Sequence, residues 1–464
     1  MARLGEHAVV IGASIAGLCA ARVLSDRFDR VTVFDRDGLP EGPDNRQAVP
    51  QGRHLHLLLA RGAEELGELF PGLLEDMVAA GVPILENQPE CIHFGAAGHV
   101  LGTTDRLRQE FTTYVPSRPQ LEWQIRRRVQ AIENITFEKR AVSEPRFDAA
   151  SQRVTGVLVD SPDRGEPEFV AADLVIDSTG RGTRLPVWLE QWGFERPHET
   201  TVDVGITYAT HRLRIPDGLI KEKLVVDGAA HDRHVGLGLL LYEDGTWILT
   251  TFGVAKEEPP QNFDEMCAVA EKILPTHIAD ALRQAEPIGD IAFHKYPTSR
   301  WRRFDKLSRF PSGIVPVGDA VVSFNPTFGQ GMTMSILQAA NLRRALDSAG
   351  ADPARALNKA TARSIYPVWM TDAVADLTMH GAEGNIPWWY PRVSKMFDQF
   401  LEAAETEPVL AEWFLRRFSL LDSLWMVPGP AIVARTMRHN LRCWLAERRD
   451  AKQATAGRAL VTNK

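Results

Sequence analysis

The fold of this chain is decided by the stretch Val9-Val10-Ile11-Gly12-Ala13-Ser14-Ile15-Ala16-Gly17, which is followed by Val31-Thr32-Val33-Phe34-Asp35. An apolar strand, a glycine turn and a helix N-terminus together favour a bound pyrophosphate. Gly17 lets the helix pack closely on the strand, and Asp35 can accept hydrogen bonds from ribose hydroxyls. An ordinary strand-turn-helix is the alternative, but Asp35 at the end of the second strand favours a dinucleotide site. Ser14 replaces the middle glycine of G-x-G-x-x-G.

The length, composition and charge of the chain limit the classes of protein to which it can belong. The chain has 464 residues, of which 44% are hydrophobic and 24% charged, so we expect two or three packed regions. Its net charge of −7 argues against nucleic acid as a partner. No stretch of 18 apolar residues occurs, which predicts a cytoplasmic protein without an integral membrane span. The cysteines lack metal-type spacing, which predicts reduced thiols and no metal site: Cys19, Cys91, Cys267 and Cys443.

Several further segments carry structural predictions. The segment Val49–His56 holds two histidines and an arginine before a helix that we expect to begin at His54. Because a metal site needs three or four convergent ligands, capping and ligand contact are the favoured roles of these histidines. A helix is expected over 118–129, with Arg126, Arg127 and Arg128 on a solvated face. An antiparallel meander is expected from 135–139, 154–159 and 168–170, and the tryptophans of the helical C-terminal third are expected in the core.

A second acidic turn lies about 300 residues after the first. A strand leads into Gly318-Asp319-Ala320, and Pro326 and Gly329-Gln330-Gly331 follow before a long helix. An extended FAD needs an acceptor for its ribityl hydroxyls, and Asp319 is suited to this. Its ring also needs N–H groups near the pyrimidine edge, which a second helix N-terminus after Gly331 can supply. The two motifs together predict FAD.

With these motifs the chain resembles the group A flavin-dependent monooxygenases, which have the para-hydroxybenzoate hydroxylase fold, over roughly residues 5–350. Segments 49–56 and 177–182 are similar to those of actinomycete epoxidases that act on polyether polyenes. The resemblance implies that Asp35 binds the adenosine ribose, that Arg118 lies along the ribityl chain and pyrophosphate, that Asp319 holds the ribityl hydroxyls and that Pro326 flanks the ring. It also implies cofactor contacts for Gly12, Ser14, Ala16, Gly17, Arg36, Arg46, Gly329, Gly331 and Met332.

The predicted architecture is α/β: a Rossmann-like FAD-binding domain of the GR2 type, a β-rich substrate domain and a C-terminal helical region. The FAD-binding domain is expected to be discontinuous, from residues 1–80, 116–190 and 296–350. The substrate domain is expected from 81–115 and 191–295, and the helical region from 351–464. Two departures from the family pattern stand out. Thr179 takes the place of an aspartate before Gly180, which bears on nicotinamide docking, and Val322 stands where histidine is usual.

The resemblance implies that NAD(P)H reduces noncovalent FAD and that dioxygen adds at the flavin C4a. The hydroperoxide then transfers oxygen to an apolar small molecule. Epoxidation of an alkene in secondary metabolism such as antibiotic biosynthesis is favoured, since it needs alignment and a dry pocket, and no catalytic acid or base is nominated. Alternatives are an aromatic polyketide hydroxylase, an unsaturated-lipid reductase and a flavoprotein without redox turnover. A halogenase is disfavoured because no Trp-x-Trp-x-Ile-Pro run occurs. The oligomeric state stays open.

Overall fold

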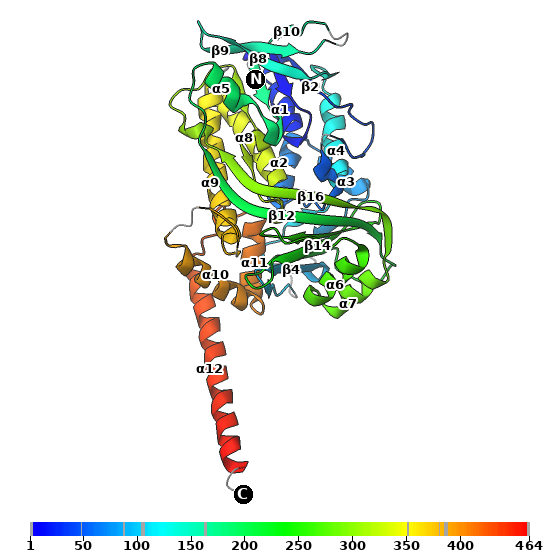
Figure 1. Ribbon diagram of the computed structural model, residues 1–464, viewed down its shortest axis with the longest axis vertical. Coiled ribbons are helices and arrows are strands. Elements are labelled where there is room, and N and C mark those ends of the chain that lie inside the picture. The colour runs from blue at the N-terminus through cyan, green and yellow to red at the C-terminus, as the bar shows by residue number, and fades with distance from the viewer. Residues whose placement is uncertain are drawn as a thin grey trace.

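The computed structural model describes residues 3–47, 49–86, 89–103, 107–161, 165–349, 352–379, 381–384 and 388–461. It confirms the predicted α/β class. The body is elongated (Figure 1). A domain built on a parallel sheet lies at one end, a large sheet crosses the other end, and a long terminal helix extends from the body. The predicted boundary between residues 350 and 351 lies outside the described residues. Within these ranges, no helix combines the length and apolar content needed to cross a bilayer.

A five-stranded parallel sheet forms the first domain, in the order β17-β11-β1-β2-β7. Its strands are short and almost wholly buried, as expected where helices cover both faces: β1 (Gly5–Ile11), β2 (Phe28–Asp35), β7 (Ile135–Lys139), β11 (Leu174–Asp177) and β17 (Ile314–Pro316). Helices pack around it: α1 (Ile15–Ser25), α2 (Ala60–Leu69), α3 (Leu73–Ala79), α4 (Arg118–Gln130), α5 (Leu185–Gln191) and α8 (Gly331–Ala349). Because β1 lies between β2 and β11, all three strands end at one edge.

The small sheet corrects two predictions. Residues 135–139 belong to the parallel sheet, where β7 pairs with β2. The antiparallel meander instead consists of β8 (Val142–Asp148), β9 (Arg153–Val159) and β10 (Glu168–Ala171). The first of these was missed because Pro145 and three charged residues hide its alternation.

Arg126 was also misplaced, since its guanidinium is buried and donates to Pro40 O at 2.6 Å.

An eight-stranded sheet spans the second domain, in the order β18-β16-β12-β15-β14-β13-β4-β5. Its longest strands pair antiparallel across both domains (Figure 1). The members are β4 (Ile92–Ala96), β5 (His99–Val100), β12 (Glu199–Arg214), β13 (Leu224–Asp227), β14 (Val235–Leu241), β15 (Trp247–Gly253), β16 (Glu286–Arg302) and β18 (Val322–Ser323). Two amphipathic helices, α6 (Phe263–Ile273) and α7 (Thr276–Arg283), pack on it. A separate pair joins β3 (Ile84–Glu86) to β6 (Thr112–Tyr114).

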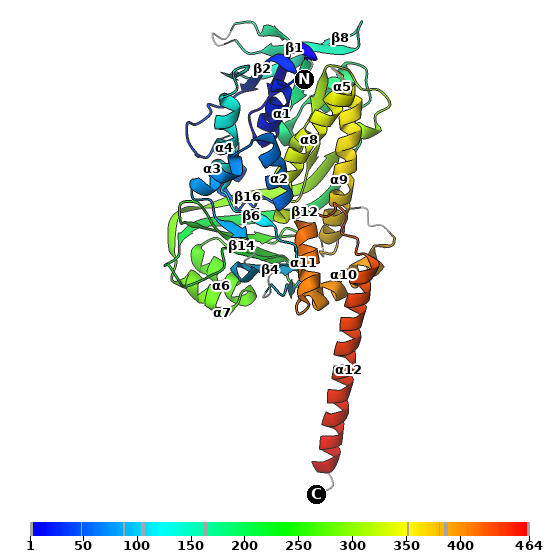
Figure 2. The same ribbon diagram turned by 180° about the vertical axis from the view of Figure 1, so that it is seen from behind.

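The C-terminal third is helical, as predicted, but its helices have different neighbours. Of these, α9 (Ala354–Asp376) packs on α8 of the first domain, whereas α10 (Tyr390–Ala404) and α11 (Pro408–Phe418) lie beside the large sheet (Figure 2). The last, α12 (Pro430–Val461), extends outward. Trp369 is buried, but Trp388, Trp425 and Trp444 are exposed, so the prediction of core tryptophans is wrong for these three.

Candidate cofactor and substrate site

The turn between β1 and α1 allows only glycine at two positions. Gly12 has φ +105°, and a Cβ on Gly17 would lie 1.9 Å from Gly12 O and 2.6 Å from Ser178 Oγ. Such contacts exclude any side chain at Gly17 unless the helix moves off the strand. Ser14 occupies the N-cap position of α1 without a side-chain capping bond, and its Oγ accepts a hydrogen bond from Arg118 Nη2 at 2.8 Å. The turn and α4 are therefore held together by the residues that the sequence singled out.

A buried chain of charges lies at the end of β2. Asp35 Oδ2 accepts hydrogen bonds from Ala13 N and from Arg46 Nη2, both at 2.7 Å. Arg46 Nη1 also donates to Glu122 Oε1 at 2.8 Å. Burial opposes the charge of Arg46, but Glu122 and Asp35 outweigh this effect, so the pKa of the guanidinium is raised. Arg46 thus fixes Asp35 near the predicted adenosine, while the exposed Arg36 joins none of these contacts among the described residues.

The second glycine turn lies directly against the first. Gly318 has φ +65°, and a Cβ there would lie 2.7 Å from the Ala16 Cβ. The adjacent Asp319 side chain is partly buried. Burial raises the pKa of this carboxyl, while the positive charges of Arg181, Arg118 and Arg302 oppose the rise. The structure thereby brings Asp319 and Arg118 to one side of the β1–α1 turn.

Arg302 fastens two turns of the site to each other. This buried guanidinium donates from Nη2 to Arg181 O at 2.7 Å, and from Nη1 to Asp319 O at 3.2 Å and Ala320 O at 3.1 Å. The first carbonyl belongs to the turn after β11 and the other two to the turn after β17. Sequence reasoning missed Arg302, since it lies at the end of a long strand of the other domain.

The departure at Thr179 has a local structural role. Asp177 is fully buried, and its Oδ1 accepts hydrogen bonds from Thr179 N at 3.0 Å and Thr179 Oγ1 at 2.5 Å. Its Oδ2 accepts from Thr183 Oγ1 at 2.5 Å. Both carboxylate oxygens of Asp177 therefore shape the turn after β11.

The loop before α8 is anchored by two buried carboxyl groups on α9. Asn325 Nδ2 donates to Asp376 Oδ1 at 2.6 Å. With its nitrogen facing α9, the Gln330 amide lies 3.0 and 3.1 Å from the two oxygens of Asp372. Burial raises the pKa of Asp376 to about 7, and burial together with the charge of Asp376 raises the pKa of Asp372 well above its ordinary value. Sequence reasoning missed this pair; its only signal is two aspartates at i, i+4 spacing in a long helix.

The residues around these turns leave the space and the donors that an FAD needs. Ideal Cβ atoms built on Gly329 and Gly331 meet nothing within 4 Å among the described residues, so the N-terminus of α8 faces open space. Arg118 Nε is buried and has no hydrogen-bond partner within the same ranges. Pro326 lies in a single 3-10 turn beside this space, and Met332 packs in the core behind it. An open glycine edge next to an incompletely paired cation fits a flavin and its pyrophosphate.

A polar cluster lies on the large sheet. The helix predicted from His54 begins only at Ala60, because residues 54–59 run along the sheet and donate to it. His54 Nδ1 lies 2.8 Å from Thr210 Oγ1, and its ring centroid lies 5.4 Å from that of His294. Burial lowers the pKa of His54 to about 4, with His294 and Arg53 adding to the effect, so this imidazole is neutral at pH 7. Tyr208 packs against both rings, and its buried Oη has no partner among the described residues.

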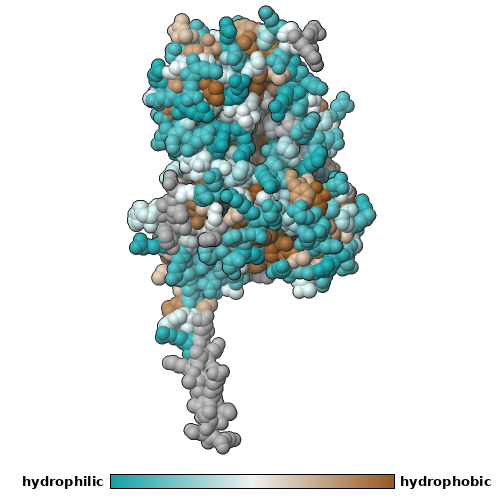
Figure 3. All heavy atoms as spheres, viewed as in Figure 1, coloured by the Kyte–Doolittle hydropathy of each residue, from teal (hydrophilic) through white to brown (hydrophobic). Residues whose placement is uncertain are grey.

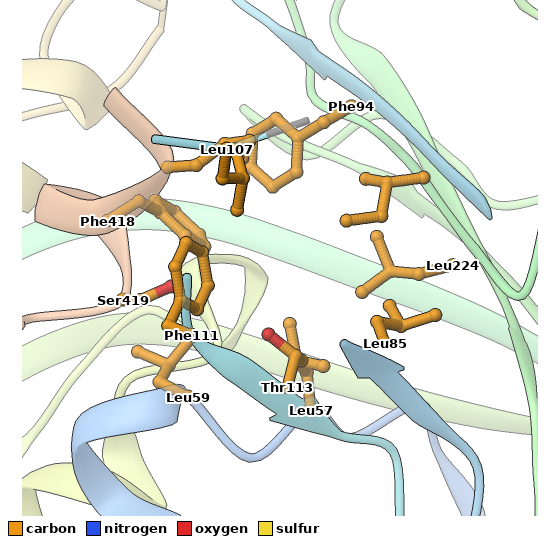
Figure 4. A pocket seen from close by; sticks show the side chains of 12 residues that line it. Leu57, Leu59, Leu85, Phe94, Leu107, Phe111, Thr113, Leu224, Phe418 and Ser419 are labelled. Carbon is orange, nitrogen blue, oxygen red and sulfur yellow. The ribbon is translucent and has the colours of Figure 1, made fainter. Parts of the chain in front are cut away.

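An apolar pocket lies between the large sheet and α11. Phe111 and Phe418 lie on one side of it and Leu85 and Leu224 on the other (Figure 4). Thr113 and Ser419 contribute polar atoms, and the other lining residues are Leu57, Leu59, Ile92, Phe94, Leu107 and Leu415. The segment with Leu57 and Leu59 leads into α2, whose Gly62 lies against Thr333 in the first turn of α8. The segment before α2 therefore lines the pocket, and α2 itself continues to the open glycine edge.

Comparison with known proteins identifies close and distant relatives. The model of the Mycobacterium Rv3254 C-terminal domain matches residues 384–450. Protein Rv3254 of Mycobacterium tuberculosis is 64% identical over 98% of both chains. A kynurenine 3-monooxygenase of Salinispora arenicola is 26% identical over 82% of this chain and 80% of its own length.

Solved structures with the same fold include a monooxygenase and a flavin-dependent brominase. The p-nitrophenol 4-monooxygenase PnpA of Pseudomonas putida superposes with a TM-score of 0.62 at 16% identity, covering 91% of this chain and 99% of its own. The flavin-dependent brominase Bmp2 gives a TM-score of 0.60 at 15% identity, covering 94% and 99%. These likenesses confirm the predicted group A flavin monooxygenase fold. By sequence, the chain belongs to the same family as protein Rv3254 of Mycobacterium tuberculosis.

Proposed function

We propose that the protein is an FAD-dependent monooxygenase that uses NAD(P)H and O₂ to insert oxygen into a long apolar substrate, by epoxidation of an alkene. The observation that supports this substrate class is the apolar pocket between the large sheet and α11, which is lined mostly by leucine and phenylalanine. When bound, FAD would pass electrons from NAD(P)H to O₂ and so supply an electrophilic oxygen. A role in secondary metabolism and a cytoplasmic location belong to the same proposal.

The residues of the site would bind and orient. Asp35, Arg118 and Asp319 would hold the adenosine, pyrophosphate and ribityl chain, in the geometry that Arg46 and Arg302 fix. The N-terminus of α8 would face the pyrimidine edge of the ring and favour negative charge there. The apolar pocket would keep water away and bury the methylene groups of the substrate at about 0.8 kcal/mol each. Alignment and exclusion of water would then be the contribution of the protein.

The polar cluster on the sheet supports a second candidate, hydroxylation of an aromatic ring. Neutral His54 and the Tyr208 hydroxyl, which has no partner among the described residues, could accept or relay a proton from a phenol. Arg181, which lies 4.3 Å from the centroid of the Tyr296 ring, acts electrostatically on both His294 of this cluster and Asp319. We rank this second because these groups lie beside the apolar pocket and are not among the residues that line it.

Absorbance, NAD(P)H oxidation and product analysis of the purified protein distinguish these functions. We expect flavin absorbance bands, NAD(P)H oxidation stimulated by polyenes, and a product one oxygen atom heavier that carries an epoxide. A ring hydroxyl, or phenols converted as efficiently as any polyene, would favour the second candidate. Flavin that neither NADH nor NADPH reduces would favour a non-redox or partner-reduced flavoprotein. The variant Gly331→Ala adds a methyl group at the open edge, so it should weaken FAD binding without lowering the stability of the flavin-free protein.

A further inference from the structure

Exposed apolar side chains are concentrated in the C-terminal part of the chain. Of the fourteen large apolar residues exposed within the described ranges, nine lie between Trp388 and Leu445. In Figure 3 the visible face of the body is mostly hydrophilic, and the larger groups of hydrophobic residues lie over its lower half, where Figure 1 shows the large sheet. Large apolar patches are seldom left on the surface of a protein that has no partner. The last helix contributes four of the nine.

These four residues form one stripe along α12. Met437, Leu441, Trp444 and Leu445 follow the spacing i, i+4, i+7, i+8, which places them on a single face. The exposed fraction is 67% for Met437 and 56% for Leu441. The first turns contact the body through the buried Thr436 and through Asn440, which borders the stripe and whose Nδ2 donates to Gln399 O at 3.3 Å, while the stripe itself is left exposed. The apolar stripe therefore points away from the body.

A row of arginines borders the apolar stripe. Arg438 and Arg442 follow Met437 and Leu441 in the sequence, so they lie beside them on the helix, and both are exposed. The Arg448 guanidinium lies 3.8 Å from the centroid of the Trp444 ring, at the far end of the stripe. Residues 430–464 hold eight arginines and lysines against two acidic residues, while the whole chain has a net charge of −7. Positive charge is thus segregated onto this segment.

We propose that α12 docks on an anionic lipid bilayer, lying in the plane of the interface with Met437, Leu441, Trp444 and Leu445 inserted. A helix with an apolar stripe, a basic border and low overall hydrophobicity binds such surfaces, and tryptophan favours the interface. A second copy of this chain fits less well, because pairing two such stripes would bring arginines of like charge together along the seam. Docking would place the protein where long apolar substrates partition, but it rests on α12 alone and does not depend on the proposed function.

The test is sedimentation of the full chain with lipid vesicles. We expect binding to vesicles of phosphatidylcholine mixed with an equal amount of phosphatidylglycerol, and little binding to phosphatidylcholine alone. The double variant Met437→Glu/Leu441→Glu should abolish binding. The double variant Arg438→Gln/Arg442→Gln should weaken it by about tenfold or more, since each arginine near an anionic surface contributes roughly fivefold. Added salt should weaken binding of the unaltered chain.

Matched controls separate docking from general surface effects. Phe169→Glu changes an exposed aromatic residue on β10, at the opposite end of the molecule, and Arg214→Gln removes an exposed arginine from β12. Both should bind vesicles like the unaltered chain, and circular dichroism should report an intact fold in all variants. Equal binding to both vesicle types, no binding to either, or loss of binding in the controls would overturn the proposal. So would a dimer in sedimentation velocity that the Met437→Glu/Leu441→Glu variant dissolves.

Discussion

Arg46 in the cofactor domain and Arg435 at the base of α12 each pair with a carboxylate, and they differ in their access to water. Arg46 is almost completely buried between Asp35 and Glu122. Arg435 lies 3.1 Å from Glu407 with both side chains partly exposed. The difference extends to whole regions, because the cofactor domain encloses its charges whereas the last helix leaves both charges and apolar side chains at the surface. The charges of the first region are paired within the protein, and the second region has a surface suited to a partner.

The largest effect is expected from Arg46→Ala. This change leaves Asp35 and Glu122 buried without their shared cation, so the free energy of unfolding should fall by about 3–5 kcal/mol. Urea denaturation measures the loss, and the matched variant Arg36→Ala at an exposed neighbour should change the value by less than about 0.5 kcal/mol. Equal effects of the two variants would show that the buried chain of charges does not stabilise this region.

The titration of Asp376 tests the contact between α9 of the C-terminal third and the cofactor domain. Its pKa of about 7 in the folded protein lies above the ordinary value of 3.8, so the folded state holds a proton that the unfolded state releases. The resulting stability is complete below pH 4 and is lost as pH rises toward 7, with a slope of up to about 1.4 kcal/mol per pH unit. In Asp376→Asn the slope of unfolding free energy against pH should become shallower by about that amount. The exposed Asp217→Asn should leave the slope unchanged, and an unchanged slope in Asp376→Asn would contradict the assignment.

Two glycines sharpen the contrast between close packing and open surface. The Cβ of Gly17→Ala would overlap Gly12 O, so we expect a loss of about 1–3 kcal/mol in unfolding free energy together with poor retention of FAD. Gly429, just before α12, meets nothing within 4 Å among the described residues, so Gly429→Ala creates no overlap and should cost less than about 1 kcal/mol. Thermal denaturation and flavin absorbance measure both variants. A stable, fully yellow Gly17→Ala protein would show that strand and helix can separate without cost.

The smallest effect is expected from Arg435→Ala. Exposed ion pairs contribute between zero and about 1 kcal/mol, because water screens them and ordering long side chains costs entropy. Denaturation in low and high salt measures the contribution, which should vanish in high salt. A loss as large as that of Arg46→Ala would mean that the base of α12 is as enclosed as the cofactor domain.

Sequence reasoning succeeded where one local geometry explains each residue. Gly12, Gly17 and Gly318 were recognised because turns and close approach require glycine there, and the structure shows both requirements. It failed where a residue is defined by distant partners. Arg126 was expected in solvent because arginine usually is, yet the carbonyl groups of the loop after β2 accept its hydrogen bonds inside the protein. Nothing in the spacing of Asp372 and Asp376 indicates that two amides 40 to 50 residues earlier would contact them.

The apolar pocket could not be predicted for the same reason. Its walls come from α11, the segment before α2 and strands of two sheets, which meet only in the folded chain. The domain limits and the cofactor contacts of individual residues stay predictions. The class of fold was predictable because strands that end at one edge of a parallel sheet bring their loops together whatever lies between them.

Arg302 has a consequence for the order in which the protein opens. One guanidinium donates to carbonyl oxygens of two turns that follow different strands, so a turn that moves away breaks its hydrogen bond to the side chain that also holds the other turn. Amide protons of 180–183 and 318–321 should therefore exchange with deuterium at a common rate, as a single cooperative unit. In Arg302→Leu the two rates should separate. Each turn alone would then keep its part of the cofactor site in position.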